Sequence, residues 1–150
     1  MHPPNPAQSP SISPSMIPPQ SIEAEQAVLG TILLQDKALL KIVEILAADD
    51  FYRDAHKTIF AAMLSLFEKR EPHDLITLTS LLSDQNKLEQ VGGASYLASL
   101  TDIIPFSGTL VHHAQIIRKK SVLRRLIQTT AEVPARCYDT QDDIETLIDQ

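Results

Sequence analysis

The sequence predicts an all-α protein, in which a globular bundle of short helices is followed by a protruding helical hairpin. Apolar residues from position 21 onward recur at three- and four-residue spacing, and no segment shows the period-two alternation of a half-buried strand. The first 19 residues differ, since they hold seven of the ten prolines and almost no charge. We therefore expect a disordered tail at 1–19, a helical head at 20–104 and a hairpin at 105–150.

A strong helix-start pattern opens the head. Ser21 is a natural N-cap, because its hydroxyl can accept a hydrogen bond from an amide of the first turn. Glu23 and Glu25 then place negative charge at the positive end of the helix dipole. Gly30 lies inside this helix, predicted at 21–34, at a cost of about 1 kcal/mol relative to alanine. Such a glycine indicates that another backbone packs closely against it.

Four more short helices are expected in the head, at 36–46, at 54–69, from about 77, and at 94–103. Asp74 or Thr77 is expected to cap the third of these, after a short extended approach at 74–76. Gly92 and Gly93 suit a tight left-handed turn. Pro105 should end the last helix, because a residue before proline is displaced from helical geometry.

The hairpin begins with one long helix, predicted at 108–131, which Pro134 should kink or stop. A second helix at 143–150, with a start pattern at 140–143, is still in progress at the last residue, so we expect a longer parent protein. A lone two-helix hairpin cannot bury its apolar surface on both sides, which predicts self-association through a twofold interface. The apolar stripe expected to do this consists of Val122, Leu123, Leu126 and Ile127.

Charge is unevenly distributed along the chain. A net charge of −6 argues against a dedicated nucleic-acid-binding protein, yet five of the thirteen basic residues fall within 118–125. These five, which border the apolar stripe on both sides, are Arg118, Lys119, Lys120, Arg124 and Arg125. The pattern favours the edges of a helix–helix interface, with acidic residues at 142–149 as counter-charges. Contact with a partner protein or with phosphate is the alternative, so direct DNA binding by 118–125 remains open.

No catalytic constellation is found. The chain lacks a phosphate loop, a dinucleotide fingerprint, a zinc-binding HExxH and a serine elbow, so no enzyme site is expected. His112 and His113 are adjacent, which on a helix separates them by about 100° and does not suit a metal site. We expect one on the surface and one half-buried. His56 is predicted to be a core histidine, and the acids at 49–50 are predicted to cap a helix.

The cysteine content and the lengths of the apolar runs indicate the cellular compartment of the protein. Cys137 is the single cysteine, which excludes an internal disulfide and fits a reducing cytosol. No apolar run reaches the roughly 20 residues that a membrane helix needs. A cytoplasmic protein without membrane contact is therefore expected.

Several blocks resemble the N-terminal domain of the bacterial replicative DNA helicase, the DnaB family. In order along the chain they are PPQSIEAEQAVLG at 18–30, DFYRDAH at 50–56 followed by Ile59-Phe60, DLITL at 74–78, VGGASYL at 91–97, and AQIIR at 114–118 running to LRRLI at 123–127. The resemblance extends over 18–150. It implies a non-catalytic head and hairpin that pair into dimers and a trimer of dimers in a hexamer.

The resemblance also implies functions of the parent protein. The family unwinds DNA at the replication fork with ATP and Mg, through a C-terminal motor domain that this chain lacks. No cofactor and no ATPase activity are therefore expected for the chain itself, and DNA would be contacted through the parent hexamer. The expected partners are the C-terminal domain of primase and a helicase loader. A stand-alone regulatory adaptor is a weaker alternative.

By position, the resemblance implies a primase-facing surface that involves Tyr96, Ile127 and Val133. For Tyr96 the alternative is a packed helix residue whose hydroxyl points into water. The family often has a tyrosine where this chain has His113, directly before Ala114. Pro134 lies next to Val133 and would influence the position of that side chain.

Overall fold

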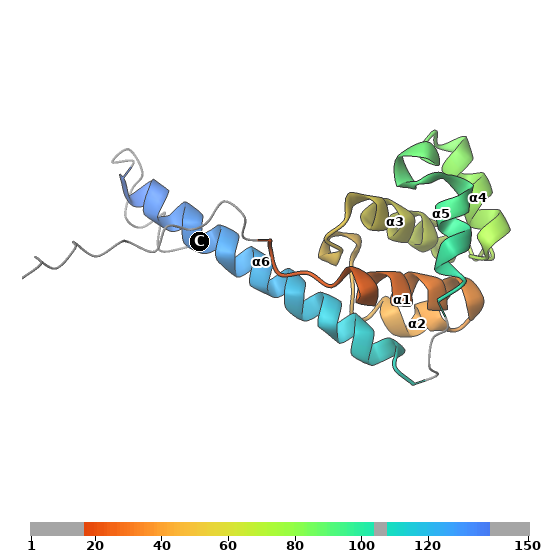
Figure 1. The fold of residues 1–150 in the computed structure, drawn as a ribbon, viewed down its shortest axis with the longest axis horizontal. Helices are drawn as coiled ribbons and strands as arrows, with labels where there is room; N and C mark the ends of the chain where they lie inside the picture. Colours follow the sequence, from red (N-terminus) through yellow and green to blue (C-terminus); the bar gives the residue numbers. More distant parts are fainter. Residues whose placement is uncertain (1–16, 104–107, 139–150) are drawn as a thin grey trace, which may run out of the picture.

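A computed structural model describes residues 17–103 and 108–138, and within these ranges the protein is helical without strands, as predicted. The elements are α1 (Ile22–Leu34), α2 (Ala38–Ile42), the 3₁₀ turn η1 (Ala48–Asp50), α3 (Asp54–Glu68), α4 (Leu75–Asp84), the 3₁₀ turn η2 (Glu89–Val91), α5 (Gly93–Leu100) and α6 (Leu110–Tyr138). Helices α1 to α5 form the head, and α6 extends away from it as a long rod (Figure 1). Residues 1–16 of the tail predicted at 1–19, and the predicted second hairpin helix at 143–150, lie outside the described residues.

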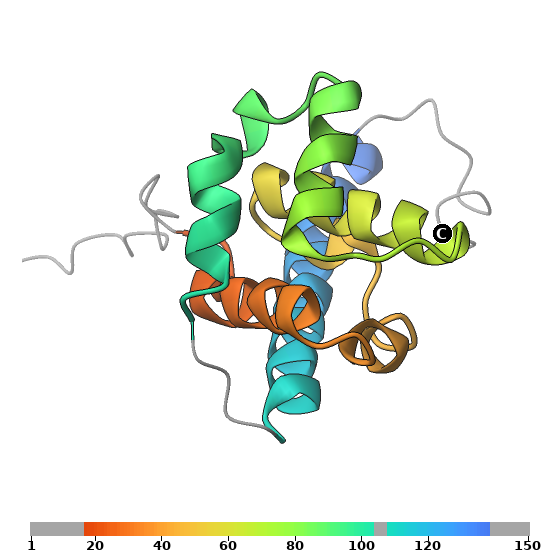
Figure 2. The same cartoon turned by 90° about the vertical axis from the view of Figure 1, so that its right-hand side faces the viewer.

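Helix α1 forms the centre of the head. Its N-cap is confirmed, because the Ser21 hydroxyl accepts a hydrogen bond from the amide of Ala24 at 3.3 Å. The helix packs against α3, α5 and α6, and Figure 2 shows it crossing α6. Val28, Leu29 and Ile32 are fully buried there. Burial on several sides makes α1 the element around which the others assemble.

Gly30 is the point where α5 closes onto α1. A Cβ atom added at Gly30 would overlap the backbone carbonyl oxygen of Leu100 and would lie 4.0 Å from the Cβ of Ile103. The predicted close approach of another backbone is therefore confirmed. Only glycine leaves room for that carbonyl.

Replacing Gly30 with alanine should lower the free energy of unfolding by about 1–3 kcal/mol, the usual cost of overpacking a core. This loss should exceed the helix-propensity gain of about 1 kcal/mol. Urea unfolding followed by circular dichroism measures the change. Thr129→Ala, on an exposed turn of α6, is the control for propensity alone and should change stability by less than about 0.5 kcal/mol. A Gly30→Ala protein as stable as the unaltered chain would contradict the close contact.

Predicted boundaries of α2 and α4 were wrong. Helix α2 ends at Ile42 instead of 46, because the Ile45 amide bonds to the Ile42 carbonyl at 2.9 Å and tightens the turn, which carries Leu46 into the core. Helix α4 begins at Leu75 without an extended approach. Its cap is Asp74, whose carboxylate accepts a hydrogen bond from the amide of Thr77 at 2.8 Å.

The other shifted boundaries lie at either end of α5 and in α6. Helix α5 covers Gly93–Leu100 rather than 94–103, and Gly92 before it has a φ of +107°, the left-handed turn expected there. Helix α6 continues through Pro134 to Tyr138, so the predicted stop was wrong. Proline removes one amide from the helix and leaves the carbonyl of Thr130 without its usual partner. Because Thr130 is exposed, water can bind that carbonyl and the helix can continue.

The core of the head includes part of α6. Ala114 and Ile117 are buried in the same cluster as Phe51, Phe60 and Leu97. The first half of α6 is therefore packed into the head, and only its second half projects. None of the helices in the described ranges is both long and apolar enough to cross a membrane.

Candidate docking surfaces

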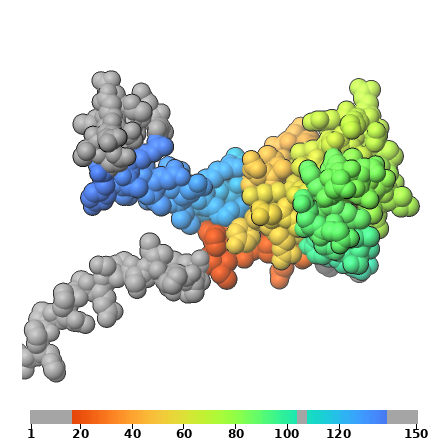
Figure 3. Space-filling model, turned by 90° about the horizontal axis from the view of Figure 1, so that it is seen from above, coloured from red at the N-terminus to blue at the C-terminus, as the bar shows by residue number. Residues whose placement is uncertain are grey.

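The second half of α6 presents an apolar face that nothing in the described chain covers. Figure 3 shows this half of the helix extending beyond the head. The side chains that contact the head from α6 are the buried Ala114, Ile117 and Ser121. At about 100° per residue, the opposite side of the helix carries the predicted self-association residues. We call Val122, Leu123, Leu126, Ile127 and Val133 the outer stripe; their side chains are 36 to 58% exposed.

A buried carboxylate ties the middle of α6 to the head. Asp50 is 1% exposed, and its Oδ1 accepts hydrogen bonds from the Arg118 guanidinium at 2.8 Å, the Ser121 hydroxyl at 2.7 Å and the Arg125 guanidinium at 2.9 Å. Its Oδ2 accepts from the amide of Ala47 at 2.8 Å. We call Asp50, Arg118, Ser121 and Arg125 the Asp50 latch.

The electrostatics of the latch favour an ionised carboxylate. Burial alone would raise the pKa of Asp50. The Ala47 amide, the Ser121 hydroxyl and the Arg118 guanidinium stabilise the negative charge and together lower the pKa below its ordinary value. The carboxylate is therefore a charged anchor at neutral pH.

A third arginine strengthens the same junction. Arg124 donates hydrogen bonds to the carbonyl of Asp50 at 2.7 Å and to the carbonyl of Pro19 at 2.8 Å. Its guanidinium also lies 5.5 Å from the centre of the Tyr52 ring, within cation–π range. Three of the five clustered basic residues are thus engaged by the head, which leaves less of the cluster for phosphate. The acids at 142–149, predicted as counter-charges, lie outside the described residues.

Sequence reasoning missed most of the latch. The acids at 49–50 were predicted to cap a helix, and Asp50 does cap η1 through the Ala47 amide. Its tie to α6 was not predicted. A signal was present, because Arg118, Ser121 and Arg125 are spaced three and four residues apart and therefore form a polar patch on one helix face.

Tyr96 is half-buried on α5, and its hydroxyl is engaged within the head instead of pointing into water. It lies 2.6 Å from Nε2 of His56, 3.3 Å from the side-chain amide of Gln26 and 3.4 Å from the guanidinium of Arg53. His56 is fully buried, as predicted, and its Nδ1 lies 2.8 Å from a carboxylate oxygen of Glu25. Tyr96 is therefore fixed by the core behind it.

The three residues assigned to a primase surface fall on two separate parts of one chain. Tyr96 is on α5 in the head, whereas Ile127 and Val133 are on the projecting half of α6. Figure 1 places these two segments at opposite ends of the molecule. A partner that contacts all three must therefore span this distance or bridge two chains.

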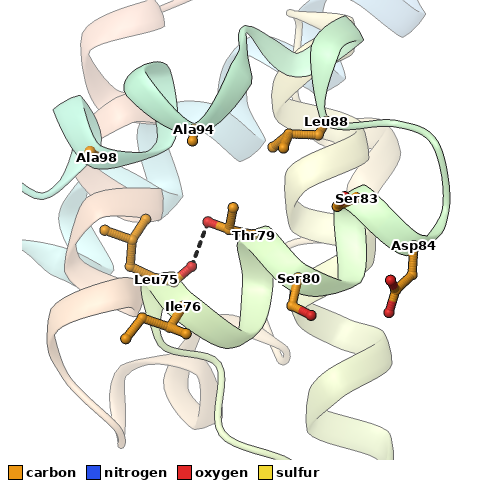
Figure 4. A pocket seen from close by; sticks show the side chains of 9 residues that line it. All are labelled: Leu75, Ile76, Thr79, Ser80, Ser83, Asp84, Leu88, Ala94 and Ala98. Carbon is orange, nitrogen blue, oxygen red and sulfur yellow. Dashed lines mark hydrogen bonds between the residues drawn. The ribbon is translucent and has the colours of Figure 1, made fainter.

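A hollow of about 580 Å³ lies between α4 and α5 (Figure 4). Its lining is mostly small or apolar, and the residues are Leu75, Ile76, Thr79, Ser80, Ser83, Asp84, Leu88, Ala94 and Ala98. Ile76 is 82% exposed at its edge, and Asp84 is the only ionisable group in the lining. None of the predicted site residues lines this hollow, and one carboxylate does not make a catalytic site.

The histidine pair on α6 behaves as predicted. His112 is exposed and His113 is half-buried, with ring centres 6.1 Å apart. In the part of the chain that the structure describes, no three His, Cys, Asp or Glu side chains are grouped so that they could hold a metal ion.

Comparison with known proteins identifies similar sequences and folds. A family model described as the DnaB-like helicase N terminal domain matches residues 17–119. The chain is 48% identical over 134 residues to a replicative DNA helicase DnaB from Geobacillus stearothermophilus, and 46% identical over 134 residues to a replicative DNA helicase DnaC from Bacillus subtilis strain 168. Each match includes 89% of this chain but 30% of the relative. The chain thus spans about a third of the length of these relatives.

A solved structure shares the fold. The crystal structure of the N-terminal domain of DnaB helicase from Mycobacterium tuberculosis matches with a TM-score of 0.83 and 35% sequence identity. The match covers 89% of this chain and 94% of that one. The match therefore includes nearly all of that domain.

Proposed function

The chain belongs to the family of DnaB-like helicase N-terminal domains, and from that premise we propose that it is the oligomerisation and primase-docking domain of a hexameric replicative DNA helicase. The parent would act at the replication fork in the cytoplasm. ATP and Mg would be used by a motor domain that is not part of this sequence. The observation that carries the proposal is the outer stripe, an apolar face directed away from the head on a helix that projects from it.

The outer stripe supports self-association. Fully burying a leucine or isoleucine side chain contributes about 1.5–3 kcal/mol. The stripe holds several such side chains on one helix face, and a twofold interface would use each of them twice. Paired helices of this kind would build dimers, and three dimers would build the collar of a hexamer.

Primase docking is the second part of the proposal. Apolar side chains at the centre of an interface usually carry most of the binding energy. Ile127 and Val133 are exposed on the projecting half of α6, and Tyr96 supplies an aromatic edge on the head. Within a single chain, Tyr96 lies far from Ile127 and Val133. The proposed surface therefore combines the head of one chain with α6 of another. A helicase loader is proposed as a further partner of the assembled ring.

Replacing Ile127 with aspartate should weaken binding of the primase C-terminal domain by about tenfold or more, because a charge would replace an apolar contact. The head should remain folded, since Ile127 is 58% exposed and outside the core. Isothermal titration calorimetry measures the affinity, and circular dichroism checks the fold.

Two further variants make this test specific. Ala135→Asp places the same charge on an exposed turn of α6 about 80° beyond the Ile127 edge of the outer stripe, and it should bind primase normally. Val133→Asp should also weaken primase binding, and light scattering on the same samples of both outer-stripe variants shows whether the lost affinity accompanies a loss of self-association. If the unaltered chain does not bind the primase domain, the docking part of the proposal is wrong. If it binds and Ile127→Asp binds equally well, Ile127 is outside the site.

A further inference from the structure

A chain of hydrogen bonds runs from the core of the head to its surface at Tyr96. It begins at Glu25, which is 1% exposed, and passes through the fully buried His56 to the Tyr96 hydroxyl. Glu25 is itself held by the backbone amides of Tyr52 at 2.8 Å and Arg53 at 3.4 Å. The rings of His56 and Tyr96 also stack, with centres 6.0 Å apart and an interplanar angle of 12°. The hydrogen bond and the stacking with buried His56 therefore fix both the position and the tilt of the Tyr96 ring.

One arrangement of donors and acceptors satisfies all of these hydrogen bonds. Glu25 already accepts from two backbone amides, so the Nδ1 of His56 carries the proton that it shares with the carboxylate. In a neutral imidazole Nε2 is then an acceptor, and the Tyr96 hydroxyl donates to it. The two lone pairs of the hydroxyl remain for the N–H groups of Gln26 and Arg53. In this arrangement each of these donors meets an acceptor, which favours a single orientation of Tyr96.

Tyr96 forms one wall of a surface hollow of about 260 Å³. The other lining residues come from α3 and its N-cap and from the turn before α5, and they are Arg53, Ala55, Gln90, Val91 and Gly92. A side chain at Gly92 would collide with Tyr96, since an added Cβ would lie 2.8 Å from the Tyr96 Cβ. Glycine at 92 thus permits both the left-handed turn and the position of the ring.

Arg53 gives the hollow a positive charge that the head does not neutralise. Its side chain is exposed, and its guanidinium contacts the Tyr96 hydroxyl at 3.4 Å. Over residues 17–103 and 108–138, no carboxylate forms an ion pair with this guanidinium. This contrasts with Arg118 and Arg125, which both pair with Asp50. Among the hollow's lining residues Arg53 is the only charged one, and Gln90 offers a further N–H donor.

We propose that this hollow is a docking subsite for an acidic side chain of the protein partner, with Arg53 as its ion-pairing residue and with Glu25 and His56 as positioning residues for Tyr96. The inference rests on the proposed docking function and specifies one contact within it. A carboxylate suits the site because a guanidinium offers a planar pair of donors. The apolar faces of Tyr96 and Val91 would pack against the methylene groups of the same side chain.

The first test removes the charge. Titration of the primase C-terminal domain into the full 150-residue chain, at low and at high salt, compares the unaltered protein with Arg53→Gln. We expect about tenfold weaker binding at low salt and a smaller loss of affinity on adding salt, because one interfacial ion pair is gone. Arg53→Lys should fall between the two, since lysine keeps the charge without the planar donors. Lys41→Gln removes one exposed charge from α2 and is the matched control.

The second test addresses the positioning role of His56. Glutamine can place an amide near the Nε2 position that faces Tyr96, whereas asparagine reaches only the Nδ1 position that faces Glu25. Both variants should lower stability, but His56→Gln should retain more primase affinity than His56→Asn. Imidazole nitrogen NMR shifts of the unaltered chain should report a proton on Nδ1. Equal affinities for the two folded variants would overturn the positioning role.

The outcomes separate this inference from the proposed function. If the unaltered chain fails to bind the primase domain, the proposed docking function is wrong and the subsite falls with it. If it binds, and Arg53→Gln binds with the same affinity and the same salt dependence, the subsite alone is wrong. Weaker, less salt-sensitive binding by Arg53→Gln, with Lys41→Gln unchanged, supports it.

Discussion

Replacing Asp50 with asparagine is expected to lower the free energy of unfolding by about 3 kcal/mol, the range for removing one member of a buried, hydrogen-bonded charge group. The amide keeps the size of the side chain but removes the negative charge that Arg118 and Arg125 share. The NH₂ group of asparagine is a donor, and it would face N–H or O–H donors that now bind a carboxylate oxygen. The arginines are 46% and 51% exposed and can turn to water, which keeps the loss from being larger.

The effect should be specific to one of two adjacent acids. Asp49→Asn is the matched control, because Asp49 is exposed and should change stability by less than about 0.5 kcal/mol. Urea unfolding gives both values. Hydrogen exchange should also show faster exchange in α6 around Ser121 in Asp50→Asn. Ala114 and Ile117 still pack the first turns of α6 into the core of the head. We therefore expect greater local motion at the Asp50 latch, while the helix stays attached to the head. Equal stabilities of the two variants would mean that the latch contributes nothing.

The same anchor predicts a dependence of stability on pH. The pKa of Asp50 is lower in the folded chain than its ordinary value of 3.8. The unfolded chain therefore binds a proton more readily, and folding stability falls with falling pH. The contribution of Asp50 should be complete above about pH 5 and should disappear as the pH drops through the lowered folded pKa. The stability difference between the unaltered chain and Asp50→Asn should shrink over that interval, and a constant difference would argue against an ionised anchor.

Replacing Leu126 with aspartate is expected to weaken self-association by about 100-fold or more. Leu126 lies in the middle of the outer stripe and is 58% exposed in the single chain. In a twofold interface the substitution acts twice, so a loss of about 1.5 kcal/mol per site gives about 3 kcal/mol in total. Each 1.4 kcal/mol changes the dissociation constant tenfold.

Sedimentation equilibrium over a range of concentrations measures this change. Ala135→Asp adds the same charge to the same helix away from the stripe and should associate normally. Circular dichroism should show both variants folded, because neither position belongs to the core. A monomeric unaltered chain at high micromolar concentration would refute self-association. An equally strong association of Leu126→Asp would place the interface elsewhere.

Features that depend on near neighbours in the chain were predicted well. The Ser21 cap, the burial of His56 and the left-handed turn at Gly92 follow from side-chain chemistry or from periodicity within a few residues. The exposure of Leu126 and Ile127 together on one face also follows from helical spacing. The close approach at Gly30 was predicted because a glycine inside a helix is costly. Its partner, the Leu100 carbonyl, was not.

Errors arose where a local preference was outweighed by its surroundings. Proline disfavours a helix interior, yet α6 passes Pro134 because Thr130, whose carbonyl loses its partner, is an exposed residue that water can reach. The segment after Ile42 has helical spacing, but the Ile45 amide bonds to the Ile42 carbonyl three residues back, and the helix ends in a turn that packs Leu46 in the core. In both cases the free-energy difference between continuing and ending the helix is small, about 1–3 kcal/mol. Its sign depends on solvent access or packing, which the sequence does not display.

By itself, the sequence determined the helical class, the capped start of α1 and the apolar stripe on α6, since each of these is encoded within one or two helical turns. The tertiary structure alone decided what the polar side chains do. Asp50 meets Arg118, Ser121 and Arg125 across 68, 71 and 75 residues of chain, and His56 meets Tyr96 across 40. Such contacts depend on how helices cross, and a change in crossing angle would move these atoms beyond hydrogen-bond distance while every local helical pattern stayed the same.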